Sequence, residues 1–375
     1  MTGRRRVLIV TNDFPPRPGG IQAFVHQMAL RLPAELVVYA SDYEGSAPFD
    51  AAQPFPVVRH GTGLLVPTPA ARRRVVATLR EHRATAVWFG AAAPLALLAP
   101  SLRRAGAQRL VATTHGHEVG WAMLPGARQA LRRIGRHCDT VTYLGEYTRR
   151  RLAGALGPQA TMARLTPGVD VDAFTPSVSG AAVRARWGLI DRPVVVCVSR
   201  LVPRKGQDTL IKALPEIRRA VPNAVLLVVG SGRYGDTLRR LAVDTGVAEH
   251  VVFTGPVPWA ELPEHFAAGD VFAMPCRTRR AGMDVEGLGI VYLEASATGR
   301  AVVAGDSGGA PDAVRQGETG LVVDGRDVAA TAAAVAGLLA DEQRRTGMGR
   351  AGRAWAEQDW TWHVVAARLD ALLQA

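Results

Sequence analysis

The sequence predicts an α/β protein built from two doubly wound domains. Its 375 residues exceed what one hydrophobic core usually organises, so two domains of roughly 150–200 residues are expected. In both halves, short apolar runs alternate with helix-like segments, which is typical of parallel sheets buried on both faces. Prolines and glycines interrupt this pattern in residues 166–180. We therefore place the domain boundary there, between residues 1–170 and 171–359.

The strands of each predicted sheet follow from these apolar runs. In the first half they lie at residues 6–10, 35–39, 86–89, 109–113 and 140–143. In the second half they lie at residues 193–198, 224–229, 250–253, 271–274, 301–304 and 320–323. The first run ends at polar Thr11, too early for a signal peptide, so it is predicted to be a buried strand.

Cysteine usage fits a reducing cytoplasm, and hydropathy predicts no membrane-spanning helix. Cys138, Cys197 and Cys276 are unclustered and odd in number, so they predict neither a disulfide framework nor a metal site. We interpret them as packing residues. The most apolar later stretch, residues 88–100, is well short of the roughly 20 residues that span a bilayer. No membrane-spanning helix is expected.

The positive charge is concentrated in the first half of the chain. Residues 1–180 carry 22 Lys+Arg against 11 Asp+Glu, whereas residues 181–375 carry 23 against 22. Such a field attracts either nucleic acid or an acidic lipid surface. Stacking aromatics and nucleic-acid motifs do not accompany the arginines, so nucleic acid is not an expected partner. For any single cluster, a solvated arginine-rich surface is the alternative.

One basic segment, residues 69–83, has the pattern of an amphipathic helix. Its arginines include Arg72, Arg73, Arg74 and Arg80, and its apolar residues are Val75, Val76 and Leu79. The segment predicts docking on an anionic membrane surface. Packing of the three apolar residues into the domain core is the alternative, and both can hold together.

Two loops of the first half lie beyond predicted strand ends, where open parallel sheets bind their ligands. Residues 11–22 form a proline-rich loop that ends in Gly19-Gly20 before a helix, and it can present backbone N–H groups to a phosphate. A plain strand-to-helix turn also uses glycines. The second loop holds His115, His117 and Glu118, whose spacing is not that of a zinc-binding helix. A histidine hydrogen-bonded to substrate is the preferred interpretation.

The second half offers a basic pair and a glycine-rich loop. Arg200 at a strand end and Lys205 entering a helix can clamp a diphosphate and neutralise a leaving group. An exposed basic loop is the alternative. Gly230 and Gly232 satisfy the spacing of a dinucleotide-binding motif, but they follow the second strand of their domain and lack the acidic residue this motif requires. They indicate a loop facing a ligand, and do not indicate nicotinamide.

Glu286 and Glu294 lie eight positions apart, with glycines and the start of an apolar helix between them. Glycines let the backbone approach a phosphate, free N–H groups at a helix start attract the anion, and carboxylates can bind sugar hydroxyls. The alternative is a pair of acidic residues that favour the helix dipole. The combination suits a sugar nucleotide.

Taken together, these motifs resemble the retaining two-Rossmann-domain glycosyltransferases that include glycogen synthases and sucrose synthases. The resemblance covers essentially the whole chain. Residues 11–22, 114–118, 275–279 and 284–289 are most similar to the actinobacterial phosphatidylinositol mannosyltransferases, in the branch that adds mannose to the monomannoside. It implies the GT-B architecture, with two domains facing across a cleft and the last helix, about residues 360–375, crossing back to the first domain.

The resemblance implies a role for each motif. Arg200 and Lys205 hold the diphosphate, Glu286 meets the mannose hydroxyls and Glu294 the ribose. His115 corresponds to the donor-sugar histidine. The remaining donor contacts come from Gly19 and Gly20 in a loop that closes on the phosphate, from Gly230 and Gly232, from Val257 in a candidate base pocket, and from the backbone of Gly287, Leu288, Gly289 and Ile290.

The implied reaction is transfer of mannose from GDP-mannose to a phosphatidylinositol mannoside, with retention of configuration. The acceptor hydroxyl enters beside the departing phosphate, and fixed positive charge stabilises the leaving group. Asp13 lies where the acceptor approaches, either binding a hydroxyl or serving as a turn residue. The scheme needs no metal or other cofactor. The enzyme is expected to associate peripherally with the inner face of the cell membrane.

Other functions remain open at this point. A transferase of the same family with another donor or glycolipid acceptor is the nearest. A sugar-nucleotide epimerase shares the two-domain architecture. A nicotinamide dehydrogenase rests on residues 230–235 alone, and a lipid-surface binding protein leaves Glu286 and Glu294 without a role.

Overall fold

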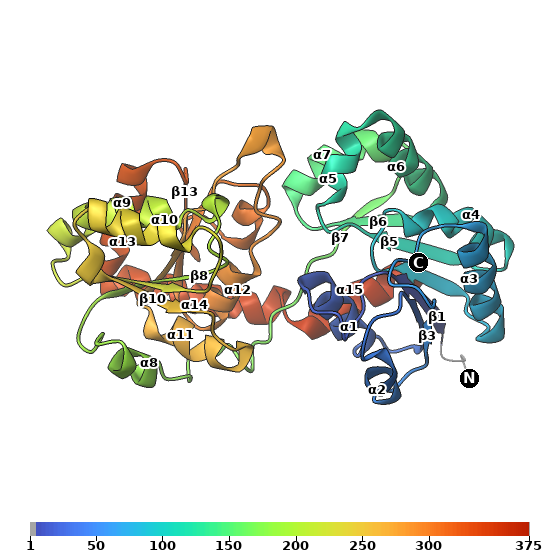
Figure 1. The fold of residues 1–375 in the computed structure, drawn as a ribbon, viewed down its shortest axis with the longest axis horizontal. Helices are drawn as coiled ribbons and strands as arrows, with labels where there is room; N and C mark the ends of the chain where they lie inside the picture. The colour runs from blue at the N-terminus through green and yellow to red at the C-terminus, as the bar shows by residue number, and fades with distance from the viewer. Residues whose placement is uncertain (1–4, 375) are drawn as a thin grey trace. The chain divides into compact units, whose positions relative to one another are not determined.

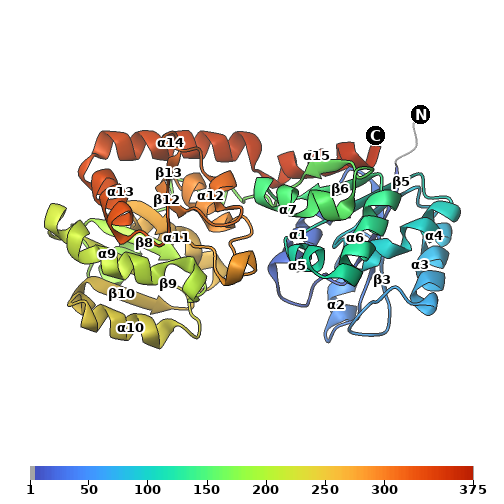
Figure 2. The same cartoon turned by 90° about the horizontal axis from the view of Figure 1, so that it is seen from above.

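A computed structural model describes residues 5–374, which form two compact units (Figures 1 and 2). Unit 1 runs to Gly168 and resumes at Trp362, and unit 2 spans Val169–Thr361. Each unit is a parallel sheet with helices on both faces, so the predicted doubly wound α/β class is confirmed.

Unit 1 contains a seven-stranded sheet in the order β3-β2-β1-β4-β5-β6-β7. Its strands are β1 Arg6–Thr11, β2 Glu35–Ala40, β3 Val57–Arg59, β4 Ala86–Phe89, β5 Arg109–Thr113, β6 Thr140–Tyr143 and β7 Met162–Arg164. Its helices are α1 Gly20–Ala29, α2 Ser46–Ala51, α3 Pro69–Glu81, η1 Leu95–Leu98, α4 Ala99–Arg104, α5 Glu118–Met123, α6 Pro125–His137, α7 Glu146–Leu156 and α15 Trp362–Gln374.

The central strands of unit 1 are buried on both faces. In β1, Leu8 and Val10 belong to one hydrophobic cluster, and Val7 and Ile9 belong to another on the opposite face of the sheet. This is why the strand reads as a continuous apolar run. The sequence pattern missed the edge strands β3 and β7, because each has only three residues and none of these is fully buried.

Unit 2 contains a six-stranded sheet in the order β10-β9-β8-β11-β12-β13. Its strands are β8 Val194–Val198, β9 Val225–Val229, β10 Val251–Gly255, β11 Val271–Met274, β12 Ala301–Gly305 and β13 Gly320–Val323. Its helices are α8 Ala181–Arg186, η2 Pro203–Lys205, α9 Gln207–Ala220, α10 Gly235–Asp244, η3 Ala248–His250, η4 Trp259–Glu261, α11 Leu262–Ala268, η5 Arg280–Gly282, α12 Ile290–Ala297, η6 Ala310–Ala313, α13 Val328–Ala340 and α14 Glu342–Asp359. All six predicted strands are present, and each begins or ends within two residues of its predicted bound.

The last helix, α15, returns to unit 1, as the family resemblance predicted. It packs beside α1 and against β4 and β5, which Figure 1 shows as red beside blue. Val365, Ala366, Leu369 and Leu373 are buried in the same cluster as β1. The C-terminal segment therefore completes the core of unit 1.

Leu369→Ala should destabilise unit 1 by about 2–5 kcal/mol, because the leucine is fully buried and its truncation leaves a cavity. Urea unfolding followed by circular dichroism measures the change. Leu372→Ala, at a half-buried position of the same helix, is the matched control and should cost less. Equal, small losses for both variants would show that α15 does not contribute to the core.

Helix α3 shows which of its predicted residues pack into the core. Val75 and Leu79 are buried in the core of unit 1, so they are not available to insert into lipid. Arg72, Arg73 and Arg80 are exposed. The helix therefore exposes its arginines and buries Val75 and Leu79.

Two further observations bear on the sequence predictions. Cys138, Cys197 and Cys276 are free thiols and all are buried, as expected of packing residues. Among residues 5–374, no helix has both the length and the hydropathy needed to cross a bilayer.

Candidate functional site

In unit 1, candidate residues gather where the order of the sheet reverses, at the carboxyl ends of β1, β4 and β5. Open parallel sheets bind ligands at this position. The loop after β1 carries Asp13 and Gly19 and leads into Gly20, the first residue of α1, and the loop after β5 carries His115 and His117. The sheet therefore places these five residues on one edge of unit 1.

His115 is oriented by the neighbouring strand. Its Nε2 lies 2.6 Å from the carbonyl oxygen of Gly90, which follows β4. A carbonyl only accepts hydrogen bonds, so Nε2 carries the proton and Nδ1 keeps its lone pair. Burial lowers the pKa of His115 to about 4, which keeps the ring neutral at pH 7. Its Nδ1 can thus accept a hydrogen bond from a sugar hydroxyl.

Glu118 is the buried support of this loop. Its carboxylate accepts hydrogen bonds from the backbone N–H groups of His115 at 3.0 Å and Gly116 at 3.1 Å. His117 Nε2 lies 3.3 Å from the other carboxylate oxygen. Burial raises the pKa of Glu118, and the nearby His117 opposes that rise. Glu118 therefore fixes the loop. Among residues 5–374, no group of three or more His, Cys, Asp or Glu side chains is arranged to hold a metal ion.

Asp13 is held by the helix that follows its loop. Gln22 donates a hydrogen bond from Nε2 to Asp13 Oδ1 at 2.8 Å. Burial raises the pKa of Asp13, while His117 and Arg17 oppose the rise. A Cβ atom on Gly19 would lie 2.0 Å from Gln22 Oε1, so Gly19 leaves room for the side chain that orients Asp13.

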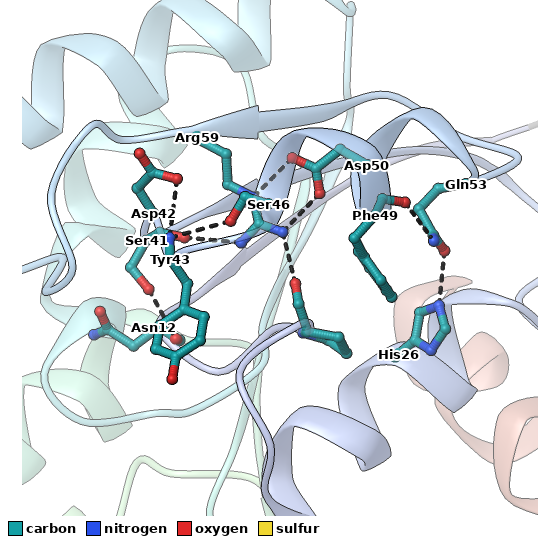
Figure 3. A network of polar contacts seen from close by, with 11 residues as sticks. Asn12, His26, Ser41, Asp42, Tyr43, Ser46, Phe49, Asp50, Gln53 and Arg59 are labelled. Carbon is teal, nitrogen blue, oxygen red and sulfur yellow. Dashed lines mark hydrogen bonds and ion pairs between the residues drawn. The ribbon is translucent and has the colours of Figure 1, made fainter.

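The rest of this loop is anchored by Arg59, at the end of β3 (Figure 3). Its guanidinium pairs with Asp50 through two hydrogen bonds of 2.6 and 2.9 Å. It also donates to the carbonyl oxygens of Pro15 at 2.6 Å and Ser41 at 2.9 Å. Arg59 therefore ties the loop after β1 to α2 and to the loop after β2.

In unit 2, the basic pair and the first glutamate also lie where the sheet order reverses, between β8 and β11. Lys205 Nζ and Glu286 Oε2 form an ion pair of 2.6 Å, and both side chains are about nine-tenths buried. This excludes the alternative of an exposed loop for Lys205. Gly206 follows at φ 78°, and a Cβ there would lie 2.0 Å from the carbonyl oxygen of Pro275. The two loops are thus in backbone contact.

Arg200, by contrast, is exposed. Its backbone is fixed because Gln207 donates from Nε2 to the carbonyl oxygen of Arg200 at 3.0 Å and to Ser199 Oγ at 2.8 Å. The glycine-rich loop packs on the same segment. A Cβ on Gly230 would lie 2.1 Å from the carbonyl oxygen of Ser199. The loop also reaches β10, because the N–H of Gly230 donates to the carbonyl of Gly255.

The segment from Glu286 to Ile290 forms the predicted turn into a helix. Gly289 is the N-cap of α12 at φ 78°, and a Cβ there would lie 2.4 Å from the Tyr292 ring. The turn before α12 therefore requires glycine at this position. The free N–H groups of the first turn of α12 follow it directly and can bind an anion. Val257 lies beyond β10 and packs partly against the core.

A second glycine pair, Gly308-Gly309, supports this turn from the loop after β12. The N–H of Gly309 donates to the carbonyl oxygen of Glu286 at 2.9 Å. A Cβ on Gly308 would lie 2.0 Å from that oxygen, and a Cβ on Gly309 2.1 Å from the carbonyl oxygen of Gly287. Ser307 accepts a hydrogen bond from the N–H of Glu286. These three residues set the position of the segment that carries Glu286.

Glu294 lies within α12, which begins at Ile290, and Glu286 precedes that helix. Desolvation raises the pKa of Glu294 from 4.5 to about 7. Glu294 is half-buried and forms no ion pair within residues 5–374. A desolvated carboxyl of this kind is costly to ionise, unless a bound ligand supplies hydrogen-bond donors. Ribose hydroxyls are donors of that kind.

The raised pKa of Glu294 predicts a stability that depends on pH. Between pH 4.5 and about 7 the folded state binds more protons than the unfolded chain, so this group lowers the free energy of unfolding as pH rises. Glu294→Gln removes that loss, which reaches up to about 3 kcal/mol. The variant should gain stability relative to the parent between pH 5 and pH 8 in thermal unfolding, and the exposed-site control Glu342→Gln should not. A pH-independent difference for Glu294→Gln would contradict the assignment.

Two family models match the chain: the model described as Glycosyl transferases group 1 over residues 183–355, and that described as Glycosyltransferase Family 4 over residues 18–173. The GDP-mannose-dependent alpha-(1-6)-phosphatidylinositol monomannoside mannosyltransferase of Mycolicibacterium smegmatis is 58% identical over 373 residues, which cover 98% of each chain. The chain belongs to the GT-B glycosyltransferases.

Two other relatives of this glycosyltransferase extend the comparison. The GDP-mannose-dependent monoacylated alpha-(1-6)-phosphatidylinositol monomannoside mannosyltransferase of Corynebacterium glutamicum is 49% identical, over 100% of this chain and 99% of its own. The structure of HepE from Anabaena in complex with UDP matches with a TM-score of 0.80 at 21% identity, over 99% of both chains. The latter supports the fold alone.

Several residues of this glycosyltransferase were not found by sequence reasoning. The pair Gly308-Gly309 follows a predicted strand, which is a signal that could have located it. Gln22 belongs to residues 11–22, which the sequence analysis describes as a candidate loop, but no role was predicted for this side chain. Arg59 gave no signal, because its strand was not predicted and its partners lie up to 44 positions away.

Proposed function

We propose that this glycosyltransferase transfers mannose from GDP-mannose to a phosphatidylinositol monomannoside, forming an α-(1→6) linkage with retention of configuration. The observation that carries the proposal is full-length identity of 58% and 49% to proteins named for this activity. No cofactor or metal takes part.

Unit 2 supplies the donor contacts in this proposal. Arg200 and Lys205 neutralise the diphosphate as it departs, and the N–H groups from Gly287 to Ile290 donate hydrogen bonds to its oxygens. Glu286, held by Lys205 at 2.6 Å, receives hydrogen bonds from the mannose hydroxyls. Glu294 receives those of the ribose, which compensates the desolvation that raises its pKa.

Unit 1 supplies contacts to the transferred sugar and to the acceptor in this proposal. His115 offers a neutral Nδ1 acceptor to the transferred sugar, as its hydrogen bond to Gly90 favours. Asp13, oriented by Gln22, binds an acceptor hydroxyl. The departing phosphate itself takes the proton of the attacking hydroxyl. Glu286 and Glu294 therefore do not act as the acid and nucleophile of a glycosidase.

Calorimetry and product analysis test the donor. GDP should bind more tightly than UDP, and GDP-mannose should be consumed in preference to UDP-glucose when a glycolipid acceptor is present. Tighter binding of UDP would assign the protein to another donor within the family. Release of an epimerised sugar nucleotide without an acceptor would instead support the epimerase.

The enzyme works at a membrane surface in this proposal, docking through unit 1. Exposed Arg72, Arg73 and Arg80 on α3 supply positive charge. The loop before α3 exposes Leu64 at 62% and Val66 at 38%, which adds an apolar contact beside the arginines. Two weak contributions of this kind give reversible binding.

Replacing Arg72, Arg73 and Arg74 together with serine should reduce binding to phosphatidylinositol-rich vesicles, because each basic residue near an anionic surface contributes roughly 1 kcal/mol. Co-sedimentation at low and high salt measures this, and salt should weaken the parent in the same way. The control triple Arg132, Arg133 and Arg136 to serine changes the exposed face of α6 by the same charge. Equal binding to neutral vesicles would exclude electrostatic docking.

A further inference from the structure

Unit 2 contains a strongly cationic cavity outside the candidate donor site. Its volume is about 460 Å³, and the charged residues that line it are Lys212, Arg277, Arg279, Arg280, Arg326 and a single carboxylate, Asp208. Neither Arg200, Lys205, Glu286 nor Glu294 lines it. A second cavity of about 520 Å³ shares Arg279 and Arg280 and adds Arg204 and Arg233.

Several residues that line the first cavity are linked to the surrounding loops by hydrogen bonds. Arg277 donates to both carboxylate oxygens of Asp208, at 2.7 and 2.9 Å, and to Thr209 Oγ1 at 3.0 Å. The Thr209 hydroxyl donates to the carbonyl oxygen of Gly325 at 2.8 Å, and Arg326 donates to that of Thr278 at 2.6 Å. The start of α9 and the loops after β11 and β13 are therefore held together before any ligand binds.

Asp208, the only carboxylate that lines the first cavity, is paired within this network, whereas several lining cations lie outside that pair. The bidentate pair with Arg277 neutralises Asp208, and both side chains are largely buried. Arg279 forms an ion pair with Asp284, with an N–O distance of 3.4 Å. Lys212 and Arg280 are exposed, and within residues 5–374 neither forms an ion pair. The lining of the cavity thus carries two exposed cations, Lys212 and Arg280, that no ion pair within the described residues neutralises.

The helices add to this field. Helix α9 begins at Gln207 and α13 at Val328, and both first turns contribute residues to the lining. Helix N-termini favour anions. Prearranged arginines and a lysine at such a position match the oxygens of a phosphate, and a cavity of this volume suits a small molecule.

We propose that this cavity binds a phosphate-bearing ligand. The phosphate belongs either to a small soluble molecule, such as a phosphate ester or a diphosphate, or to a lipid head group. The site is separate from the donor clamp, so it does not rest on the proposed function.

The two lysines of the chain, Lys205 and Lys212, make the proposal directly testable. Reductive ¹³C-methylation keeps their charge and gives one NMR signal for each accessible lysine, and a Lys212→Gln variant identifies the signal of Lys212. With saturating GDP present to occupy the donor clamp, inorganic pyrophosphate should shift the Lys212 signal in a saturable and salt-sensitive manner.

Variants define the site. Lys212→Gln and Arg280→Gln should each weaken pyrophosphate binding about tenfold or more in calorimetry on the GDP complex, as expected for the loss of one charge-assisted contact. Arg240→Gln, at an exposed position of α10 that lines neither cavity, is the matched control and should bind as the parent does.

A second arm distinguishes the source of the phosphate. Vesicles of phosphatidylinositol and of phosphatidylcholine replace pyrophosphate in the same titration. A Lys212 shift with phosphatidylinositol alone supports a lipid head group, and a shift with pyrophosphate supports a soluble ligand. If neither probe moves the Lys212 signal, or if Arg240→Gln weakens binding as much as the site variants, the proposal is overturned.

Discussion

Arg200→Ala is expected to lower turnover by about 10²–10³-fold without loss of stability. This is the effect of removing one preorganised charge contact to a leaving group. Arg200 is exposed, so its removal leaves no buried partner unpaired. Lys205→Ala should lower turnover to a similar extent and also destabilise unit 2, because it leaves Glu286 buried without its partner, at a cost of about 3–5 kcal/mol.

Steady-state kinetics and urea unfolding separate these effects. The double variant Lys205→Met/Glu286→Gln removes both charges and should recover stability while turnover stays low. Arg240→Ala, an exposed arginine of the same unit, is the control for a loss of charge alone. Near-normal turnover in folded Arg200→Ala would return Arg200 to the solvated-loop alternative.

Gly309→Ala is expected to reduce kcat/KM for the donor by about 10²-fold. Its new methyl group would lie 2.1 Å from the carbonyl oxygen of Gly287, which is backbone and cannot rotate away. The segment that carries Glu286 must move, and a shift of about 1 Å at a positioning element costs an effect of this size.

Calorimetry of GDP binding, together with kinetics, measures the displacement. Gly347→Ala is the matched control, because Gly347 lies in α14 and a Cβ there meets no atom within 4 Å. Alanine should be tolerated or slightly stabilising at that position. Unchanged GDP affinity and kinetics in Gly309→Ala would show that the loop after β12 does not position the donor segment.

The sequence predicted the parts of the fold that are locally encoded. Central strands such as β1 and β8 are continuous apolar runs because both faces of each sheet are covered. The turn at Gly289 and the helix that starts at Ile290 were equally visible, because glycine and apolar spacing are local signals. The short edge strands β3 and β7 were missed, since partial burial gives no apolar run.

Long-range pairing was beyond the sequence. The sequence pattern placed Lys205 at the start of a helix. It did not indicate that Lys205 is buried against Glu286, because the two residues are 81 positions apart and only the fold brings them together. The clamp of Arg59 on Pro15 depends on an edge strand that the pattern did not reveal. For α3, the same apolar spacing fitted a membrane face and a core face, and burial of Val75 and Leu79 decided for the core.

The central claim is that this enzyme adds mannose to a phosphatidylinositol monomannoside. The most direct measurement incubates the purified protein with GDP-mannose and synthetic phosphatidylinositol monomannoside, and analyses the lipid by mass spectrometry and NMR. The account predicts a product heavier by one hexose, carrying a new α-(1→6) mannosyl bond. Transfer to unmannosylated phosphatidylinositol alone, or transfer only from a uridine-based donor, would contradict it.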